Sequence, residues 1–250
     1  MTVAPTARPP SRRRARRYLP PQHGAWAMLL LPYAVGVAGA GPVWLDVPLL
    51  VAWVGGYLLS YYVLLAIKTR RPERVAGPLR LYAALCLPAA TLVAVRAPAV
   101  WAFAPPIGAL LAVNARYARR HADRALPAGL ASAASSCLIV PVTATVAGQP
   151  VERSVLPGLV LLAYLAGSVL YVKTVIRERG DRRYLVASVS VHALAAAALV
   201  PVSWPLAALF GWFTIRAAWL PARAPTPKQV GLTEVVHSLL LLVMVPVLVR

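Results

Sequence analysis

Two ionisable residues, Glu234 and His237, lie inside the last apolar stretch of the chain. On a helix they are three positions apart and therefore share a face. Ionisable groups are costly inside a bilayer and usually face a cavity or each other, so this buried polar pair indicates a place that could carry protons or bind a cation. The alternative is an interhelical hydrogen-bonded pair that only holds the last helix in place.

A second group of polar residues lies where other apolar stretches begin or end. Arginine binds phosphate or carboxylate groups bidentately, lysine neutralises them as a point charge, and a helix N-terminus donates N–H groups to anions. These residues predict an anion-binding site, although each could instead be an interfacial anchor or a charge that sets topology. The candidates are Gln22, His23, Lys68, Asn114, Tyr117, Arg119, Lys173, Arg177 and Lys228.

Metal and nucleotide chemistry have little support in the sequence. Cys86 and Cys137 lie in apolar segments without CxxC or Cys/His spacing, so neither a zinc site nor a disulfide framework is predicted. Glu178 and Asp181 come nearest to a metal-binding pair, but they stand among cations. GxGxxG, P-loop, HExxH and GxSxG patterns with partners are missing. We expect no metal centre, and the sequence names no cofactor.

The composition shows which elements must position these side chains. The chain has 250 residues, of which 60% are apolar and 13% charged, too few polar residues to cover a soluble core of this size. It contains several apolar segments of about 17 to 25 residues, which is the length needed to cross a bilayer as a helix. We predict an all-α, polytopic transmembrane helical bundle, located as a multi-pass protein in the bacterial inner (plasma) membrane.

The chain divides into a short tail and one membrane domain. Residues 1–22 are rich in Pro and Arg and predict a disordered cytoplasmic tail that contacts anionic lipids. Residues 23–250 form a single transmembrane domain of about nine helices. The turns at Arg96/Pro98 and Pro201/Pro205 leave open whether two spans or one broken helix lie there. The predicted spans are 23–41, 46–66, 79–95, 98–115, 126–147, 155–174, 184–201, 203–220 and 230–249.

Basic residues indicate the orientation. With nine spans and the N-terminus inside, only Arg96, Arg153 and Arg250 of the 26 Lys and Arg residues fall outside. The positive-inside rule therefore favours nine helices with an N-in, C-out topology.

The net charge of +19 could suggest nucleic acid as a partner. Because the arginines lie between apolar spans, we expect membrane lipids as partners instead, and no nucleic acid.

Four short segments resemble the YwiC-like integral membrane proteins. They are Pro21-Gln22-His23-Gly24-Ala25-Trp26-Ala27-Met28, Asn114 with Tyr117-Ala118-Arg119-Arg120, Tyr171-Val172-Lys173-Thr174 with Arg177-Glu178-Arg179, and Pro227-Lys228-Gln229-Val230-Gly231. The resemblance runs from about the first helix to the last. It implies a membrane protein without implying a reaction.

The chain more distantly resembles the UbiA-type intramembrane prenyltransferases. That family has nine helices with the N-terminus inside, and aspartate-rich motifs at the cytoplasmic ends of helices two and six bind magnesium and an isoprenoid diphosphate. Here the end of helix two, at Lys68, contains no Asp, and the end of helix six offers only Glu178 and Asp181. If the protein is an enzyme, the resemblance implies prenyl transfer, but these departures put its metal dependence in doubt.

Three functions follow from these patterns. The first is a UbiA-like bundle whose cationic, cytoplasm-facing cavity binds or transfers an anionic amphiphile such as an isoprenoid or lipid phosphate. The second is a small transporter or channel that uses Glu234 and His237. The third is a non-catalytic assembly partner of a membrane complex.

Overall fold

The computed structural model describes residues 18–20 and 23–249. In this part the chain forms nine consecutive helical segments and no strands. The segments are α2 (His23–Ala40), α3 (Asp46–Thr69), η1 with α4 (Pro72–Val75 and Ala76–Arg96), η2 with α5 (Pro98–Phe103 and Ala104–Arg119), α6 with α7 (Leu126–Cys137 and Ile139–Val146), α8 with η3 (Glu152–Val172 and Lys173–Arg177), α9 (Arg182–Leu199), α10 with η4 (Trp204–Trp219 and Leu220–Arg223) and α11 (Pro227–Leu248).

Each predicted span corresponds to one of these segments, so the prediction of an all-α bundle of nine helices is confirmed for the described residues. The two turns for which the sequence left the number of spans undecided each separate two helices. At the first, α4 ends at Arg96 and η2 begins at Pro98; at the second, α9 ends at Leu199 and α10 begins at Trp204. Most of the predicted tail, residues 1–17, 21 and 22, lies outside the described residues.

Six of the described segments are long and apolar enough to cross a membrane: Asp46–Thr69, Pro72–Arg96, Pro98–Arg119, Leu126–Val146, Glu152–Arg177 and Pro227–Leu248. The apolar part of α2, Ala25–Ala40, is shorter. The α9 and α10 helices, with 18 and 16 residues, are not among the six. The molecule is therefore built mainly from helices of membrane-spanning length.

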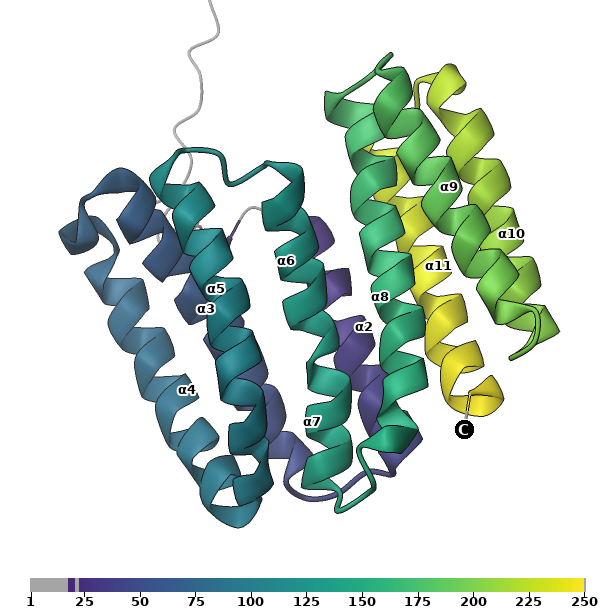
Figure 1. The fold of residues 1–250 in the computed structure, drawn as a ribbon. Helices are drawn as coiled ribbons and strands as arrows, with labels where there is room; N and C mark the ends of the chain where they lie inside the picture. The colour runs from purple at the N-terminus through teal and green to yellow at the C-terminus, as the bar shows by residue number, and fades with distance from the viewer. Residues whose placement is uncertain (1–17, 21–22, 250) are drawn as a thin grey trace, which may run out of the picture.

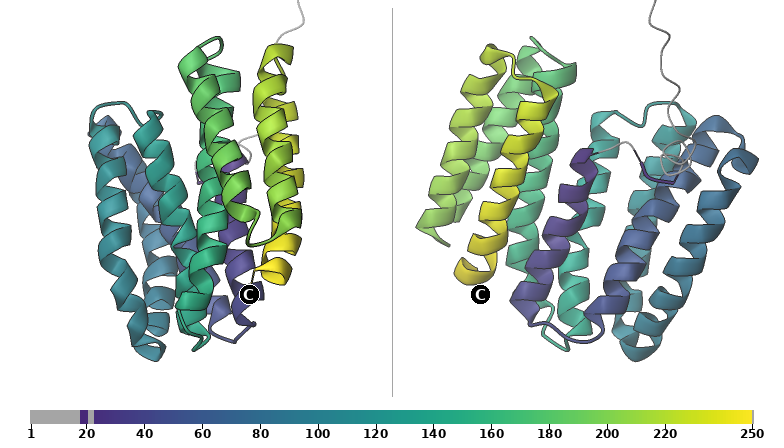
Figure 2. Two further views of the ribbon diagram at one scale, coloured as in Figure 1. Left: turned by 45° about the vertical axis from the view of Figure 1, so that its right-hand side comes forward. Right: turned by 180° about the vertical axis from the view of Figure 1, so that it is seen from behind.

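The helices run side by side, and the chain reverses direction at each connection (Figure 1). The α3, α4 and α5 helices form one side of the bundle and α9 and α10 the other, with α2, α6, α7, α8 and α11 between them (Figures 1 and 2). The α3–α4, α5–α6, α8–α9 and α10–α11 connections gather at one end. These connections are the basic loops, for which the positive-inside rule predicts a cytoplasmic location, and we refer to this end as the basic end.

A close approach of two helices fixes the centre of the bundle. The α2 helix packs against α7, α8 and α11. A Cβ atom on Gly36 would collide with the hydroxyl of Thr143 and lie 3.2 Å from the Val140 Cα, so only glycine permits this contact.

The α6 and α7 helices are separated at Leu138. Pro141 lacks the N–H that would continue the hydrogen-bond ladder there.

Three exposed tryptophans lie at the end opposite the basic loops. Trp44, Trp101 and Trp204 precede or begin α3, α5 and α10 and are all more than half exposed. The guanidinium carbon of Arg96 lies 5.4 Å from the ring centre of Trp44. Tryptophan is enriched at membrane interfaces because its ring is apolar and its N–H is polar. These residues therefore mark one edge of the apolar band.

The N-in, C-out orientation expected from the sequence predicts opposite labelling of two matched arginine positions. In a chain carrying Cys86→Ala and Cys137→Ala, Arg153→Cys should react with a membrane-impermeant maleimide in intact cells. Arg120→Cys, at the basic end, should react only after the cells are made permeable, because the positive-inside rule places that end in the cytoplasm. The reverse pattern, or equal labelling of both positions in intact cells, would contradict the orientation.

Candidate functional site

The last helix presents two ionisable side chains to the inside of the bundle. Glu234 and His237 share a face of α11, as predicted, and this face meets Arg216 of α10. Arg216 Nη1 donates a hydrogen bond to Glu234 Oε1 and lies 2.8 Å from His237 Nδ1. The Arg216 side chain is only 2% exposed. Removing one member of a buried pair typically costs about 3–5 kcal/mol, because the other charge is left uncompensated.

The α8 helix completes the surroundings of Glu234. Its second carboxylate oxygen, Oε2, accepts hydrogen bonds from the hydroxyl groups of Ser168 and Tyr164, the latter at 3.1 Å. The Tyr164 hydroxyl also lies 3.3 Å from Ser238 Oγ on α11. Tyr164 and Ser168 are four positions apart, so one helical face supplies both groups. Both carboxylate oxygens of Glu234 therefore accept hydrogen bonds from neighbouring side chains.

Both ring nitrogens of His237 face donors. Nδ1 lies 2.8 Å from Arg216 Nη1, and Nε2 lies 3.3 Å from the indole nitrogen of Trp212. Guanidinium and indole groups only donate, whereas a neutral imidazole accepts at one nitrogen alone. The shorter contact favours acceptance from Arg216, which leaves the ring proton on Nε2 facing Trp212. An acceptor that displaced the Trp212 indole would therefore meet an N–H donor.

Some buried polar atoms near this cluster have no hydrogen-bond partner among the described residues. They are Arg216 Nε and Nη2, Tyr171 Oη, Ser188 Oγ and His192 Nε2. The guanidinium carbon of Arg216 lies 4.0 Å from the ring centre of Tyr171, so the ring covers the guanidinium without satisfying its N–H groups. A buried, unmatched donor costs about 1–3 kcal/mol. The cluster is therefore incomplete as a purely structural network.

The position of His192 depends on a glycine. His192 is fully buried, and its Nδ1 lies 2.7 Å from the Ser188 carbonyl oxygen one turn earlier on α9. A Cβ atom on Gly167 of α8 would lie 2.7 Å from His192 Nε2. Glycine at this position therefore lets the imidazole lie directly against the α8 backbone.

At the basic end, two predicted lysines contact the same loop. Lys68 Nζ, in the last turn of α3, lies 2.6 Å from Asp123 Oδ1. Lys173 Nζ, at the start of η3, donates to the Arg124 carbonyl oxygen at 3.1 Å and lies 3.5 Å from Glu178 Oε1. The α5–α6 loop thus links the ends of α3 and α8. The polar atoms of both lysines are engaged within the protein.

Asp123 lies outside the membrane-spanning segments. Burial by itself would raise the pKa of its carboxyl group. The hydrogen bond from Lys68 and the positive charges of Lys68 and Arg124 outweigh burial and hold this pKa below its usual value. The Asp123 carboxylate that faces Lys68 is therefore ionised at neutral pH.

The other predicted anion-binding residues are spread over several elements. Asn114 Oδ1 lies 3.5 Å from Ser132 Oγ, and Tyr117 is half-buried in α5. Arg119 lines an open pocket of about 420 Å³ with Ile67 and Arg70. Anion binding by this set stays a prediction. Of the remaining residues, Arg177 and Lys228 are exposed, His23 begins α2, and Gln22 lies outside the described residues.

The carboxylates named as the nearest approach to a metal pair have other contacts. Glu178 faces Lys173, and Asp181 caps α9 by accepting a hydrogen bond of 2.8 Å from the backbone N–H of Arg183. Within residues 18–20 and 23–249, no group of three His, Cys, Asp or Glu side chains could hold a metal ion.

Sequence reasoning missed Arg216, because it counted this residue among the basic charges that set topology. The signal lies in the helical face of α10. Leu206, Phe210, Phe213 and Ala217 recur at helical spacing and are all fully buried. Arg216 stands three positions after Phe213 and one before Ala217, on the edge of this inward face.

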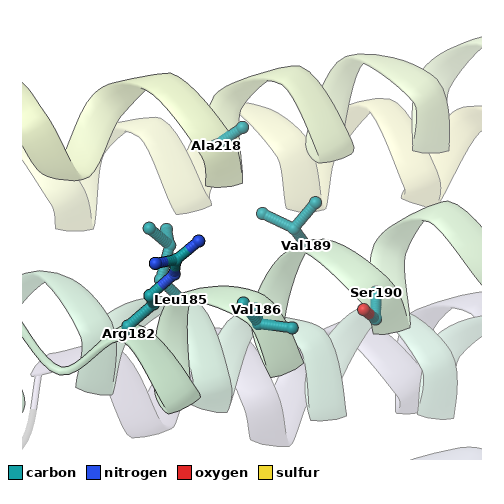
Figure 3. A pocket seen from close by; sticks show the side chains of 6 residues that line it. All are labelled: Arg182, Leu185, Val186, Val189, Ser190 and Ala218. Atoms are coloured by element: carbon teal, nitrogen blue, oxygen red, sulfur yellow. The ribbon is translucent and has the colours of Figure 1, made fainter.

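A surface pocket of about 310 Å³ opens between α9 and α10 (Figure 3). It is lined mainly by α9, with Ala218 of α10 across from it. Val189 lines the pocket and also packs in the apolar cluster that contains Tyr171 and Ala217. The lining residues are Arg182, Leu185, Val186, Val189, Ser190 and Ala218.

The described helices, six of them long and apolar enough to span a membrane, together with a buried charged cluster, define the class of a multi-spanning helical membrane protein. Residues 19–144 match the sequence model of a family described as "YwiC-like protein". The chain belongs to this YwiC-like family, as the sequence motifs predict. No solved structure matches the chain.

Two curated relatives cover most of the chain. The uncharacterised protein YwiC of Bacillus subtilis (strain 168) is 30% identical over 229 residues, which cover 88% of this chain and 93% of that protein. An uncharacterised protein of Haemophilus influenzae is 30% identical over 221 residues, covering 85% and 90%. The relationship therefore extends beyond the part that matches the family model.

Gly167→Ala should destabilise the protein although alanine is the better helix former by about 1 kcal/mol. The added Cβ would meet His192 Nε2, and such overpacking typically costs about 1–3 kcal/mol. Thermal unfolding in detergent, followed by tryptophan fluorescence, measures the change. The matched control is Gly211→Ala in α10, whose Cβ would meet nothing within 4 Å, so it should not destabilise. In a His192→Ala background, Gly167→Ala should cost much less than in the natural chain, because the imidazole that its Cβ would meet is gone; an equal cost in both backgrounds would contradict the assigned contact.

Proposed function

We propose that this protein is a proton-linked transporter, a multi-pass protein of the bacterial inner (plasma) membrane in which Glu234 carries the proton. The observation that supports this proposal is the buried cluster formed by Arg216, Glu234 and His237. Both curated relatives come from bacteria, which supports the location. Ionisable residues inside a membrane domain are expected to mark ion or substrate pathways.

A purely structural role explains this cluster poorly. Replacing a buried ion pair by apolar residues of similar volume is often neutral or stabilising, so stability alone gives little reason to bury one. Arg216 also leaves Nε and Nη2 without hydrogen-bond partners among the described residues. A guanidinium that exchanges hydrogen-bond partners during a transport cycle accounts for both the buried ion pair and the unpartnered nitrogens.

The proton step follows from the contacts of Glu234. Its carboxylate accepts hydrogen bonds from Arg216, Ser168 and Tyr164. When a proton from water binds the carboxylate, Glu234 becomes neutral and no longer balances the charge of Arg216. The guanidinium is then free to pair with another anion, which couples proton binding to solute binding.

Two helices of the bundle are interrupted, and one of them, α8, contributes Tyr164 and Ser168 to the surroundings of Glu234. The α8 helix ends in the π-helical turn Lys173–Arg177, where the Glu178 N–H donates to the Lys173 carbonyl oxygen at 2.8 Å. Single π-turns often occur at functional sites. The α6–α7 break at Leu138 is a second interruption. Transporters commonly use such discontinuous helices near their binding sites.

Glu234→Gln should abolish proton binding inside the protein. In proteoliposomes on a solid-supported membrane, a pH jump should give a transient charge displacement with the natural protein, reduced at least about tenfold in Glu234→Gln because the amide takes up no proton. The matched control, Glu152→Gln at the exposed start of α8, should keep the signal. An unchanged signal in Glu234→Gln, or no signal from the folded natural protein, would exclude the proposal.

A second candidate function is binding of an anionic amphiphile, such as an isoprenoid or lipid phosphate, at the basic end. The specific observation in its favour is the pocket of about 420 Å³ lined by Arg70, Arg119 and Ile67. Two guanidinium groups suit a phosphate, and the isoleucine suits an apolar chain. Lys68 and Lys173 already have protein partners. Prenyl transfer of the UbiA type would need metal ligands that the end of α3 lacks.

This second candidate predicts the lipids retained by the purified protein. Native mass spectrometry in mild detergent should detect phosphate-bearing lipids on the natural chain. The double variant Arg70→Gln, Arg119→Gln should retain less than about half as much, because both bidentate anion-binding groups are lost. Arg153→Gln, at the opposite end, is the control. Equal retention by the double variant and the control would count against this candidate.

A further inference from the structure

We propose that the buried, unpartnered edge of Arg216 binds the carboxylate of a small aliphatic acid. This inference rests on the proposed transport function and names its substrate class. A guanidinium has five N–H donors. Nη1 is used by Glu234 and His237, whereas Nε and Nη2 have no hydrogen-bond partner among the described residues. Nε and Nη2 together form the side-on fork that matches the two oxygens of a carboxylate.

Further unmatched polar atoms lie around this edge. Gly167 of α8 contacts His192 of α9, and because the two helices are antiparallel, Tyr171 one turn along α8 lies level with Ser188 one turn back on α9. Tyr171 lies over the Arg216 guanidinium. The unpartnered buried side-chain atoms of the described residues all belong to Tyr171, Ser188, His192 and Arg216. A bound carboxylate could accept hydrogen bonds from several of these groups together.

The surroundings favour an acid with a short apolar body. The pocket between α9 and α10 is lined by Leu185, Val186 and Val189, and Arg182 stands among its lining residues (Figure 3). Val189 also packs against the apolar cluster that contains Tyr171, so one side chain belongs both to the pocket lining and to the surroundings of Tyr171. Rotation of this side chain would admit the acid, with the carboxylate toward Arg216 and the alkyl chain in the pocket.

Charge balance requires that one proton binds together with each acid anion. The titratable and charged groups that contact Arg216 are Glu234 and His237 on α11 and Tyr171 on α8. Tyr164 on α8 contacts Glu234, and His192 on α9 contacts Phe213. A carboxylate anion beside the ionised Glu234 would leave two negative charges against one guanidinium. Uptake of one proton from the bulk aqueous phase by the Glu234 carboxylate removes this excess, so the acid anion and one proton bind together.

Butyrate is the probe for this site. The full-length chain in detergent should bind radiolabelled butyrate saturably, and unlabelled butyrate but not the neutral butyramide should compete. Arg216→Lys keeps the charge beside Glu234 but loses the fork, so affinity should fall at least about tenfold. Arg223→Lys, an exposed arginine near the same end of α10, should bind as the natural protein does. Ser188→Ala, a small change with little risk to folding, should also weaken binding.

Two results would overturn the assignment: no saturable butyrate binding by the folded natural protein, or unchanged affinity in both Arg216→Lys and Ser188→Ala. The binding assay and the pH-jump currents fail independently. Currents that need Glu234 without butyrate binding leave the transport proposal standing and remove the carboxylate. Butyrate binding that needs Arg216 without such currents supports the site and removes the transport cycle.

Discussion

The guanidinium of Arg216 has to be neutralised inside a bundle of apolar helices, and the arrangement of α8, α10 and α11 follows from this constraint. The α10 helix packs along α9 and touches α11 only sparsely. The Arg216–Glu234 pair is therefore a principal link between α10 and α11. Because Glu234 also accepts hydrogen bonds from Tyr164 and Ser168, the same carboxylate connects α11 to α8. Breaking the pair would expose an uncompensated charge to all three helices.

Much of the fold could be predicted because hydropathy and proline act locally. The α9 helix was predicted over 184–201 and covers 182–199, and the turn before α10 was recognised from Pro201 and Pro205. A span needs about 20 apolar residues, and a connection needs residues that end helices, so a one-dimensional pattern contains both. How α2 comes to lie among α7, α8 and α11 was not predictable, since it depends on contacts such as Gly36 against Thr143.

Only part of the candidate site could be predicted from the sequence. Glu234 and His237 were found because a glutamate and a histidine in an apolar segment stand out. Arg216 was not, because an arginine near the end of a predicted span has the same sequence signature whether it lies at the interface or faces inward. Only the register of α10, which turns Phe213 and Ala217 to the inside, places Arg216 beside them. Helical phase must therefore be examined for each basic residue before it is counted as a topological charge.

Exposed and buried basic residues have different roles in this protein. Arg119, Arg177 and Lys228 are exposed at the basic end, where solvent or lipid headgroups can balance their charge, and this suffices to orient a chain. Lys173 and Arg216 are buried and must be balanced by the protein itself. Lys173 is balanced by Glu178 and by the Arg124 carbonyl oxygen, which completes a structural contact. Arg216 is balanced in charge but not in hydrogen bonds, because its Nε and Nη2 have no hydrogen-bond partner among the described residues.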